Sequence, residues 1–214
     1  MPPAARRALW RPAWRLLCTA AVRLRDYDAA PLEDGSLSHG MVDNASSVAV
    51  LARLAATLSN ESLDHRLRIL FFDLEDIQLL GSAHYVSTPD AQRVAAMVNL
   101  DINGYGNTVI YGPASNDGNT EVYDALERVC AAGGHGCLRF GQFPNSDDRS
   151  FQAAGIPNIS IGLLPSDEAR QLHGLLNGPP PGGPTPPIFG IIHTPVSYTH
   201  LRAHETRHEL VCRL

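Results

Sequence analysis

Apolar residues recur along this chain with two periods, one typical of helices and one typical of buried strands. Residues 45–58 place apolar side chains three and four positions apart, behind Asp43 and Asn44, either of which is suited to cap a helix. Further helical patterns cover 79–86, 90–96, 120–132 and a turn at 150–154, and short apolar runs typical of strands cover 68–72, 97–102, 108–111, 138–140 and 158–162. Strands separated by helices predict an α/β fold, with three α/β/α layers around a mostly parallel mixed central sheet.

The two ends of the chain do not continue this pattern. Residues 1–25 are rich in Arg, Ala, Pro and Trp, and their one apolar stretch, 16–22, is shorter than a secretory signal requires. From Val196 the chain reads VSYTHLRAHETRHELVCRL, which has no periodicity and resembles a translated sequencing adapter. We therefore expect an uncertain segment at 1–25, one domain at 26–195 that is truncated at both ends, and an artefact at 196–214.

Composition excludes several classes of protein. A chain of 214 residues suits one domain, and 44% hydrophobic with 18% charged residues indicates a globular protein. The net charge of −5 and the absence of a Lys/Arg run argue against a nucleic-acid partner, and no apolar run reaches the roughly 18 to 20 residues of a transmembrane segment. Cys130 and Cys137 bracket a glycine-rich turn and could pair or stay free, which leaves the cellular compartment open.

Acidic residues fall where the predicted strands end. Glu75 and Asp76 follow one predicted strand, Asp101 lies at the end of the next, and Asp43 precedes the first helix. In open α/β sheets, ligands bind beyond the carboxyl ends of the strands. Four carboxylates at one rim would repel each other unless they surrounded a divalent cation, and His193 would complete a mixed nitrogen and oxygen set that zinc accepts.

Five segments together resemble the co-catalytic zinc aminopeptidases of metallopeptidase family twenty-eight, which also contains glutamate carboxypeptidase, glutaminyl cyclase and the transferrin receptor ectodomain. In chain order they are GMVDNASSVAVLARLA, RILFFDLEDIQLLGSAHYV, VNLDINGYG, SDDRSFQAAGIPNISIG and IIHTP, and the resemblance covers residues 26–195. It implies a zinc-exopeptidase-like fold, two zinc ions, a peptide substrate and the hydrolysis of peptide bonds at the N-terminus.

The resemblance also assigns roles to the acidic residues. Asp43 corresponds to the carboxylate that bridges two metal ions, and Glu75 to the general base that takes a proton from the attacking water. Asp76 and His193 correspond to ligands of one metal ion, and Asp101 to a ligand of the other. Neighbouring residues after a strand can face different ways, so one acid can bind metal while the next stays available for proton transfer.

One part of the family pattern is missing. The family has its first metal ligand in a His-x-Asp segment, which reads Asp-Tyr-Asp here: Asp28 matches the supporting aspartate, but Asp26 stands in place of the histidine. Asp26 is then a substitute oxygen ligand, a sequence error, or the mark of a lost metal site. His39 is either a replacement ligand or a solvated loop residue, and Asp76 is a milder departure because the family commonly has Glu there.

The segment Ser146–Asp147–Asp148 is expected to shape the loop beside the site, with Asp147 supporting the ligands, although a simple turn is the alternative. Asn103 and Tyr105 flank the end of a predicted strand and could face substrate. The carboxylate-rich rim suits a substrate's free ammonium group, which favours an aminopeptidase. A one-zinc acyltransferase resembling glutaminyl cyclase would tolerate Asp26, and a non-catalytic receptor-like domain is the third reading.

Overall fold

The structure is a computed structural model that describes residues 40–112, 120–134, 136–178 and 184–193. The chain divides into two compact units, one formed by Met1–Ile69 with Gly190–Leu214 and the other by Leu70–Phe189. The predicted terminal segments 1–25 and 196–214, and the candidates Asp26, Asp28 and His39, lie outside the described residues. Within the described ranges, the helices are all too short or too polar to span a membrane.

The first unit contains the predicted first helix. The turn η1 covers Met41–Ala45 and the helix α2 covers Ser46–Leu58. Neither Asp43 nor Asn44 caps α2: the residue before the helix is Ala45, which makes no side-chain capping bond. The prediction of a cap was wrong because the Asp43 carboxylate is engaged elsewhere, with His193. The hydroxyl of Ser46 instead donates to the carbonyl of Val42 over 3.0 Å.

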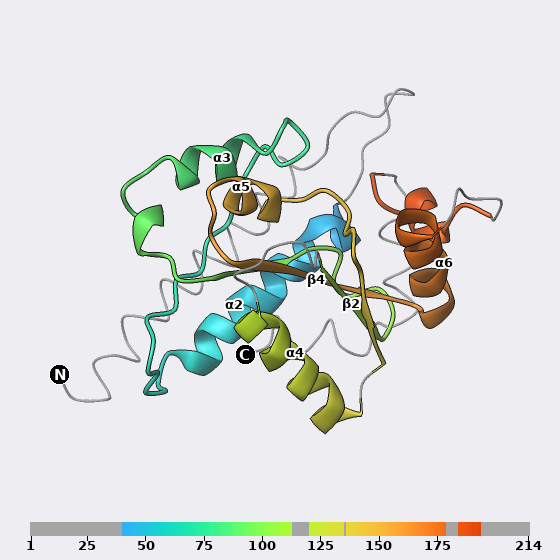
Figure 1. The fold of residues 1–214 in the computed structure, drawn as a ribbon, viewed down its shortest axis with the longest axis horizontal. Helices are drawn as coiled ribbons and strands as arrows, with labels where there is room; N and C mark the ends of the chain where they lie inside the picture. Colours follow the sequence, from blue (N-terminus) through green and yellow to red (C-terminus); the bar gives the residue numbers. More distant parts are fainter. Residues whose placement is uncertain (1–39, 113–119, 135, 179–183, 194–214) are drawn as a thin grey trace. The chain divides into compact units, whose positions relative to one another are not determined.

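A four-stranded mixed sheet forms the second unit (Figure 1). Its order is β1 (Met97–Leu100), β4 (Asn158–Leu164), β2 (Thr108–Gly112) and β3 (Cys137–Arg139). The outer pairs β1–β4 and β2–β3 are parallel, and the central pair β2–β4 is antiparallel. The prediction of a mostly parallel mixed sheet is confirmed.

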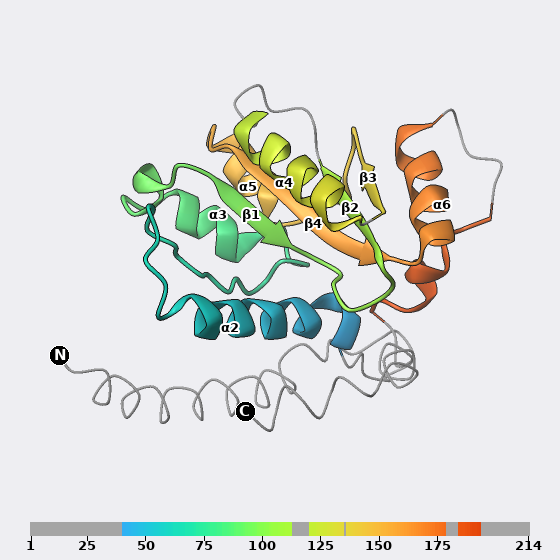
Figure 2. The ribbon, with the colours of Figure 1, turned by 90° about the horizontal axis from the view of Figure 1, so that it is seen from below.

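Helices cover both faces of this sheet, as predicted (Figures 1 and 2). Helix α4 (Thr120–Gly133) lies on one face, and α3 (Leu80–Val86) and α5 (Asp148–Ala153) lie on the other. Under α4, Tyr123 packs against Tyr111 and Ile159 of the sheet in an apolar cluster. A disulfide between Cys130 and Cys137 joins α4 to β3, so the pairing that the sequence left open is formed.

The predicted strand at 68–72 is absent from the sheet, although these residues run in an extended conformation. The apolar run is buried in another way, because the Phe72 ring packs against Tyr85 and Phe151 at centroid distances of 5.7 and 6.0 Å. Phe71, on the opposite side of the extended chain, is 46% exposed. A short apolar run predicts burial but does not specify a strand partner, which explains the error.

Two other elements differ from the prediction. The helix expected at 90–96 is reduced to the 3-10 turn η2 (Ala91–Arg93), after which the backbone becomes extended at Val94 towards β1. The helix α6 (Ser166–Asn177) was not predicted, although two acidic residues in its first turn and buried apolar residues three positions apart are helix signals. The Pro-rich segment before residue 188 ends in the 3-10 turn η3 (Pro187–Gly190).

Candidate metal centre

In the first unit, the structure brings together two predicted ligands that are 150 positions apart. The Oδ2 atom of Asp43 lies 2.7 Å from the Nε2 atom of His193. The side chain of Asp43 is 24% exposed and that of His193 is 56% exposed, so both can be reached from solvent. Asp43 lies in η1, whose backbone departs from helical geometry at this residue, with φ of −121° and ψ of 96°.

The Asp43 and His193 pair fits a metal ion by the chemistry of its donor atoms. An aspartate oxygen and an imidazole nitrogen are both common zinc ligands. Two such ligands at bond lengths of 2.0 to 2.2 Å on a tetrahedral ion stand roughly 3.3 Å apart. The observed 2.7 Å separation is shorter and is that of a hydrogen bond.

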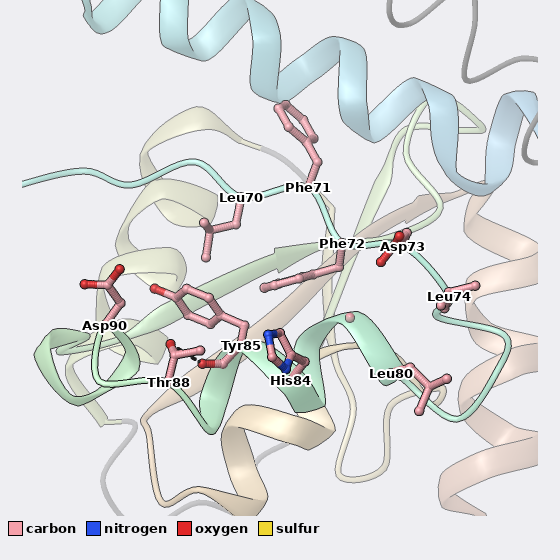
Figure 3. Close-up of a pocket in the computed structure, with 11 residues that line it drawn as sticks. Leu70, Phe71, Phe72, Asp73, Leu74, Leu80, His84, Tyr85, Thr88 and Asp90 are labelled. Carbon is pink, nitrogen blue, oxygen red and sulfur yellow. Dashed lines mark hydrogen bonds between the residues drawn. The ribbon is translucent and has the colours of Figure 1, made fainter.

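Glu75 and Asp76 lie in the second unit, at the end of the extended segment 70–74. Glu75 is half-buried, and its carbonyl accepts a hydrogen bond of 2.9 Å from the amide of Leu79, in the turn that leads to α3. The extended segment and α3 line a groove of about 590 Å³ in which Phe72, Tyr85 and His84 lie close together (Figure 3). Asp76 is exposed.

Asp101 follows β1 and is half-buried. Its amide donates to the carbonyl of Ile161 over 3.0 Å, so the register of β1 with β4 continues one residue past the strand. The same carbonyl accepts a 3.4 Å hydrogen bond from the Asn103 side chain, which is buried. Asn103 therefore points towards β4.

Left-handed backbone occurs beside several of the predicted site residues. Among the described non-glycine residues, positive φ values are found at five positions, namely Leu74 (56°), Gln78 (61°), Leu79 (58°), Ile102 (55°) and His193 (57°). This conformation is unfavourable for side chains with a Cβ atom, and most of all for a β-branched residue. Strain of this kind clusters at functional sites, and three of these residues are a predicted ligand or the neighbour of a predicted site residue.

A cluster of buried polar side chains lies between the sheet and α5. The amide of Asn99 on β1 donates to the hydroxyls of Ser146 and Ser160 at 2.9 and 3.2 Å. The next two residues after Ser146 are acidic and buried: one oxygen of Asp147 and both oxygens of Asp148 have no hydrogen-bond partner. A buried, unpaired carboxylate is unfavourable in its charged form.

The pKa values of both acids reflect this environment. Burial raises the pKa of Asp147, the nearby Ser82 hydroxyl lowers it and the charge of Asp73 raises it further. Burial raises the pKa of Asp148 to about 6, against smaller lowering effects of the Arg149 charge and the nearby Ser160 hydroxyl. Asp148 therefore keeps its proton to a higher pH than an exposed aspartate does, which its position in the sequence did not reveal.

The structure does not gather all of the predicted ligands into one group. Within the part of the chain that it describes, no three His, Cys, Asp or Glu side chains lie close enough together to hold a metal ion. Asp43 and His193 belong to one compact unit, and Glu75, Asp76, Asp101 and Asp147 belong to the other.

Comparison with known proteins identifies the family. The profile of peptidase family M28 matches residues 26–197 of this chain. The aminopeptidase YwaD of Bacillus subtilis (strain 168) is 29% identical over 141 residues, which are 63% of this chain and 30% of YwaD. Solved structures also match, and we describe two of them. The aminopeptidase from Aneurinibacillus sp. strain AM-1 has a TM-score of 0.53 and 28% identity, over 59% of this chain and 31% of that one.

The second matching structure is BSAP, a zinc aminopeptidase from Bacillus subtilis, with a TM-score of 0.52 and 25% identity over 58% of this chain and 32% of BSAP. The present chain thus spans about a third of the length of these relatives. The family match covers most of the chain and includes the segments that carry the acidic residues. On this evidence the chain belongs to peptidase family M28.

Proposed function

We propose that this protein is a zinc-dependent aminopeptidase that hydrolyses the N-terminal peptide bond of peptide substrates. The observation that carries the proposal is the pairing of Asp43 with His193, because it joins an oxygen and a nitrogen donor from distant parts of the sequence. Membership of family M28 and the similarity to bacterial aminopeptidases support it. These relatives favour a peptidase over an acyltransferase that resembles glutaminyl cyclase.

In this proposal, the chain holds two zinc ions through a shared set of side chains. The residues that would hold the ions are Asp43, Asp76, Asp101 and His193, with Asp43 shared between the two ions as the resemblance implies. When bound, zinc lowers the pKa of water and polarises the carbonyl of the scissile bond. Asp26 would replace the histidine ligand of the family pattern, Asp28 would take the role of the supporting aspartate in that pattern, and Asp147 would support the ligand loop.

Glu75 acts as the general base in this scheme. Its carboxylate takes a proton from the water that attacks the peptide carbonyl, and then delivers that proton to the departing amine nitrogen, so the residue ends the cycle unchanged. Its half-buried position in a turn with a left-handed neighbour, Leu74, restrains the backbone that carries it. A carboxylate that is not a metal ligand is suited to this role.

Substitution of Glu75 by Gln tests the proposal. A general base contributes about 10²- to 10⁴-fold to the rate, so E75Q is expected to lower kcat on an aminoacyl-p-nitroanilide by at least about 100-fold. The bound zinc of E75Q should equal that of the wild type, because the residue is not a ligand. Glu121→Gln, at an exposed position in α4, is the matched control and should leave kcat and zinc content unchanged.

The proposal is wrong if E75Q retains kcat within about twofold of the wild type, because the loss of a general base should cost at least about 100-fold. Cyclisation of a glutaminyl peptide by a chain that carries one zinc ion would favour the acyltransferase instead. Zinc content is measured by elemental analysis of the dialysed protein.

A further inference from the structure

An extended segment of the second unit has a main chain without hydrogen-bond partners. Residues 70–73 are extended but belong to no strand, and their amides and carbonyls make no hydrogen bond within the part of the chain that the structure describes. Their side chains alternate as in a β-strand, because Leu70 and Phe72 are half-buried whereas Phe71 and Asp73 are exposed. Extended main chain with unpaired groups is a template on which another extended chain can pair.

The groove described above runs along this segment, and α3 forms its other wall (Figure 3). Leu74 and Leu80 lie at one end of the groove, and Thr88 and Asp90 lie at the other (Figure 3). Glu75 follows directly on Leu74 in the sequence. The groove therefore begins beside the residue that acts as the general base in the proposed function and leads away from it.

Two contacts between the extended segment and α3 fix the width of the groove. Gly81 of α3 lies against the main chain of Asp73, since a Cβ atom on Gly81 would stand 2.5 Å from the Asp73 carbonyl oxygen. The Phe72 ring packs against Tyr85 of α3 at a centroid distance of 5.7 Å. The groove is thus preformed, and a ligand that enters it does not have to order its walls.

The charge of the groove lining favours a basic ligand. The lining residues include Asp73 and Asp90, one histidine, and no Lys or Arg. Asp90 is paired with Arg93, whereas the carboxylate of Asp73 is exposed and makes no ion pair or hydrogen bond within the described residues. A guanidinium or ammonium group of a ligand would supply the partner that Asp73 lacks.

We infer that this groove binds the part of an extended peptide substrate that follows the scissile bond, with the peptide main chain paired to residues 70–73 and a basic side chain beside Asp73. The inference rests on the proposed function and deepens it by naming the substrate class, which is peptides of several residues with Arg or Lys close to the N-terminus. A second copy of the chain is less suited to the groove, because it would bring the same acidic lining against itself.

The pairing of the main chains is tested by peptide binding to the full 214-residue chain in the presence of a chelator, so that the peptide is not hydrolysed. The probe is the peptide Leu-Val-Arg-Val-Thr-Val with a fluorophore at its C-terminus, and its binding is followed by fluorescence anisotropy. A set of variant peptides carries one N-methyl group each, at successive residues from the second to the sixth.

In a paired strand, alternate residues direct their main-chain groups towards the neighbouring strand. We therefore expect N-methylation to weaken binding by about two- to tenfold at every second residue of the peptide and to leave it unchanged at the residues between them. An effect that is equal at all positions, or a peptide that does not bind, overturns the inference. Because the changes are made in the peptide, this test does not depend on the folding of a protein variant.

Asp73→Asn tests the role of the charge. D73N should bind the probe about two- to fivefold more weakly than the wild type does, and it should no longer prefer the probe over the peptide in which Gln replaces Arg. Asp124→Asn, at an exposed position in α4, is the matched control and should keep the preference for Arg. A preference for Arg that D73N retains in full overturns the inference.

The outcomes separate this inference from the proposed function. A chain that hydrolyses an aminoacyl-p-nitroanilide but shows no alternation in the N-methyl series contradicts the inference alone. A chain that shows the alternation but hydrolyses no substrate supports the groove as a peptide site and contradicts the proposed function. A dimer in analytical ultracentrifugation, together with no binding of the probe, would assign the groove to a second copy and overturn the inference.

Discussion

Asp148 should make the protein less stable as the pH rises through the acidic range. Its carboxyl is completely buried, and burial raises its pKa from 3.8 to about 6 in the folded protein. Because the folded state then binds the proton more tightly than the unfolded chain, the free energy of unfolding falls between pH 4 and 6 and levels off above pH 6. A difference of about two pKa units corresponds to about 3 kcal/mol.

Asp148→Asn removes this titration and keeps the size of the side chain. We expect the free energy of unfolding of D148N to exceed that of the wild type by about 3 kcal/mol more at pH 7 than at pH 4, in urea unfolding followed by circular dichroism. Subtraction of the two curves cancels the other groups that titrate in both proteins, including Asp147. A difference between D148N and wild type that stays constant from pH 4 to pH 8 would show that the pKa of Asp148 is not raised in the folded protein.

Two other predictions concern the packing of the second unit. The Cys130–Cys137 disulfide closes a short loop between two cysteines that are seven positions apart in the sequence. Its reduction, or its removal by C130S with C137S, should destabilise the protein by about 2.5 kcal/mol. Thermal melts with and without reductant measure this loss, and an unchanged midpoint would count against the pairing. Phe151→Ala should lower the free energy of unfolding by about 3 to 5 kcal/mol, because the buried Phe151 ring packs against Tyr85 and Phe72 at centroid distances of 5.9 and 6.0 Å. Phe71→Ala, at a half-exposed position, is the control and should change it by less than about 1 kcal/mol. Similar losses for both variants would contradict the described packing.

Much of the fold could be predicted because the hydrophobic pattern records which side chains are buried. The helix α2 and four of the five predicted strands are present. Each of these four strands has a neighbouring strand to pair with in the sheet. The segment 68–72 shows the limit of this reasoning. Its apolar residues are a reliable sign of burial, but contact of Phe72 with Tyr85 and Phe151, rather than strand pairing, provides it.

The candidate site shows the same limit for polar residues. The family pattern singled out Asp43 and His193 by their sequence motifs, and the structure brings their side chains into contact across 150 positions. Asp148 could not be identified in the same way, because its importance depends on burial and on unpaired oxygen atoms rather than on a motif. A charged residue in a sequence is usually solvated, and only the packing around it reveals the exceptions.

The most direct test of the account is whether zinc controls peptide hydrolysis by this chain. The protein is treated with a chelator, dialysed, and titrated with zinc while the hydrolysis of leucine p-nitroanilide is followed. We expect activity to disappear on chelation and to return as zinc is added, with saturation at about two ions per chain. Hydrolysis that persists unchanged after complete removal of zinc, or no hydrolysis at any zinc concentration, would contradict it.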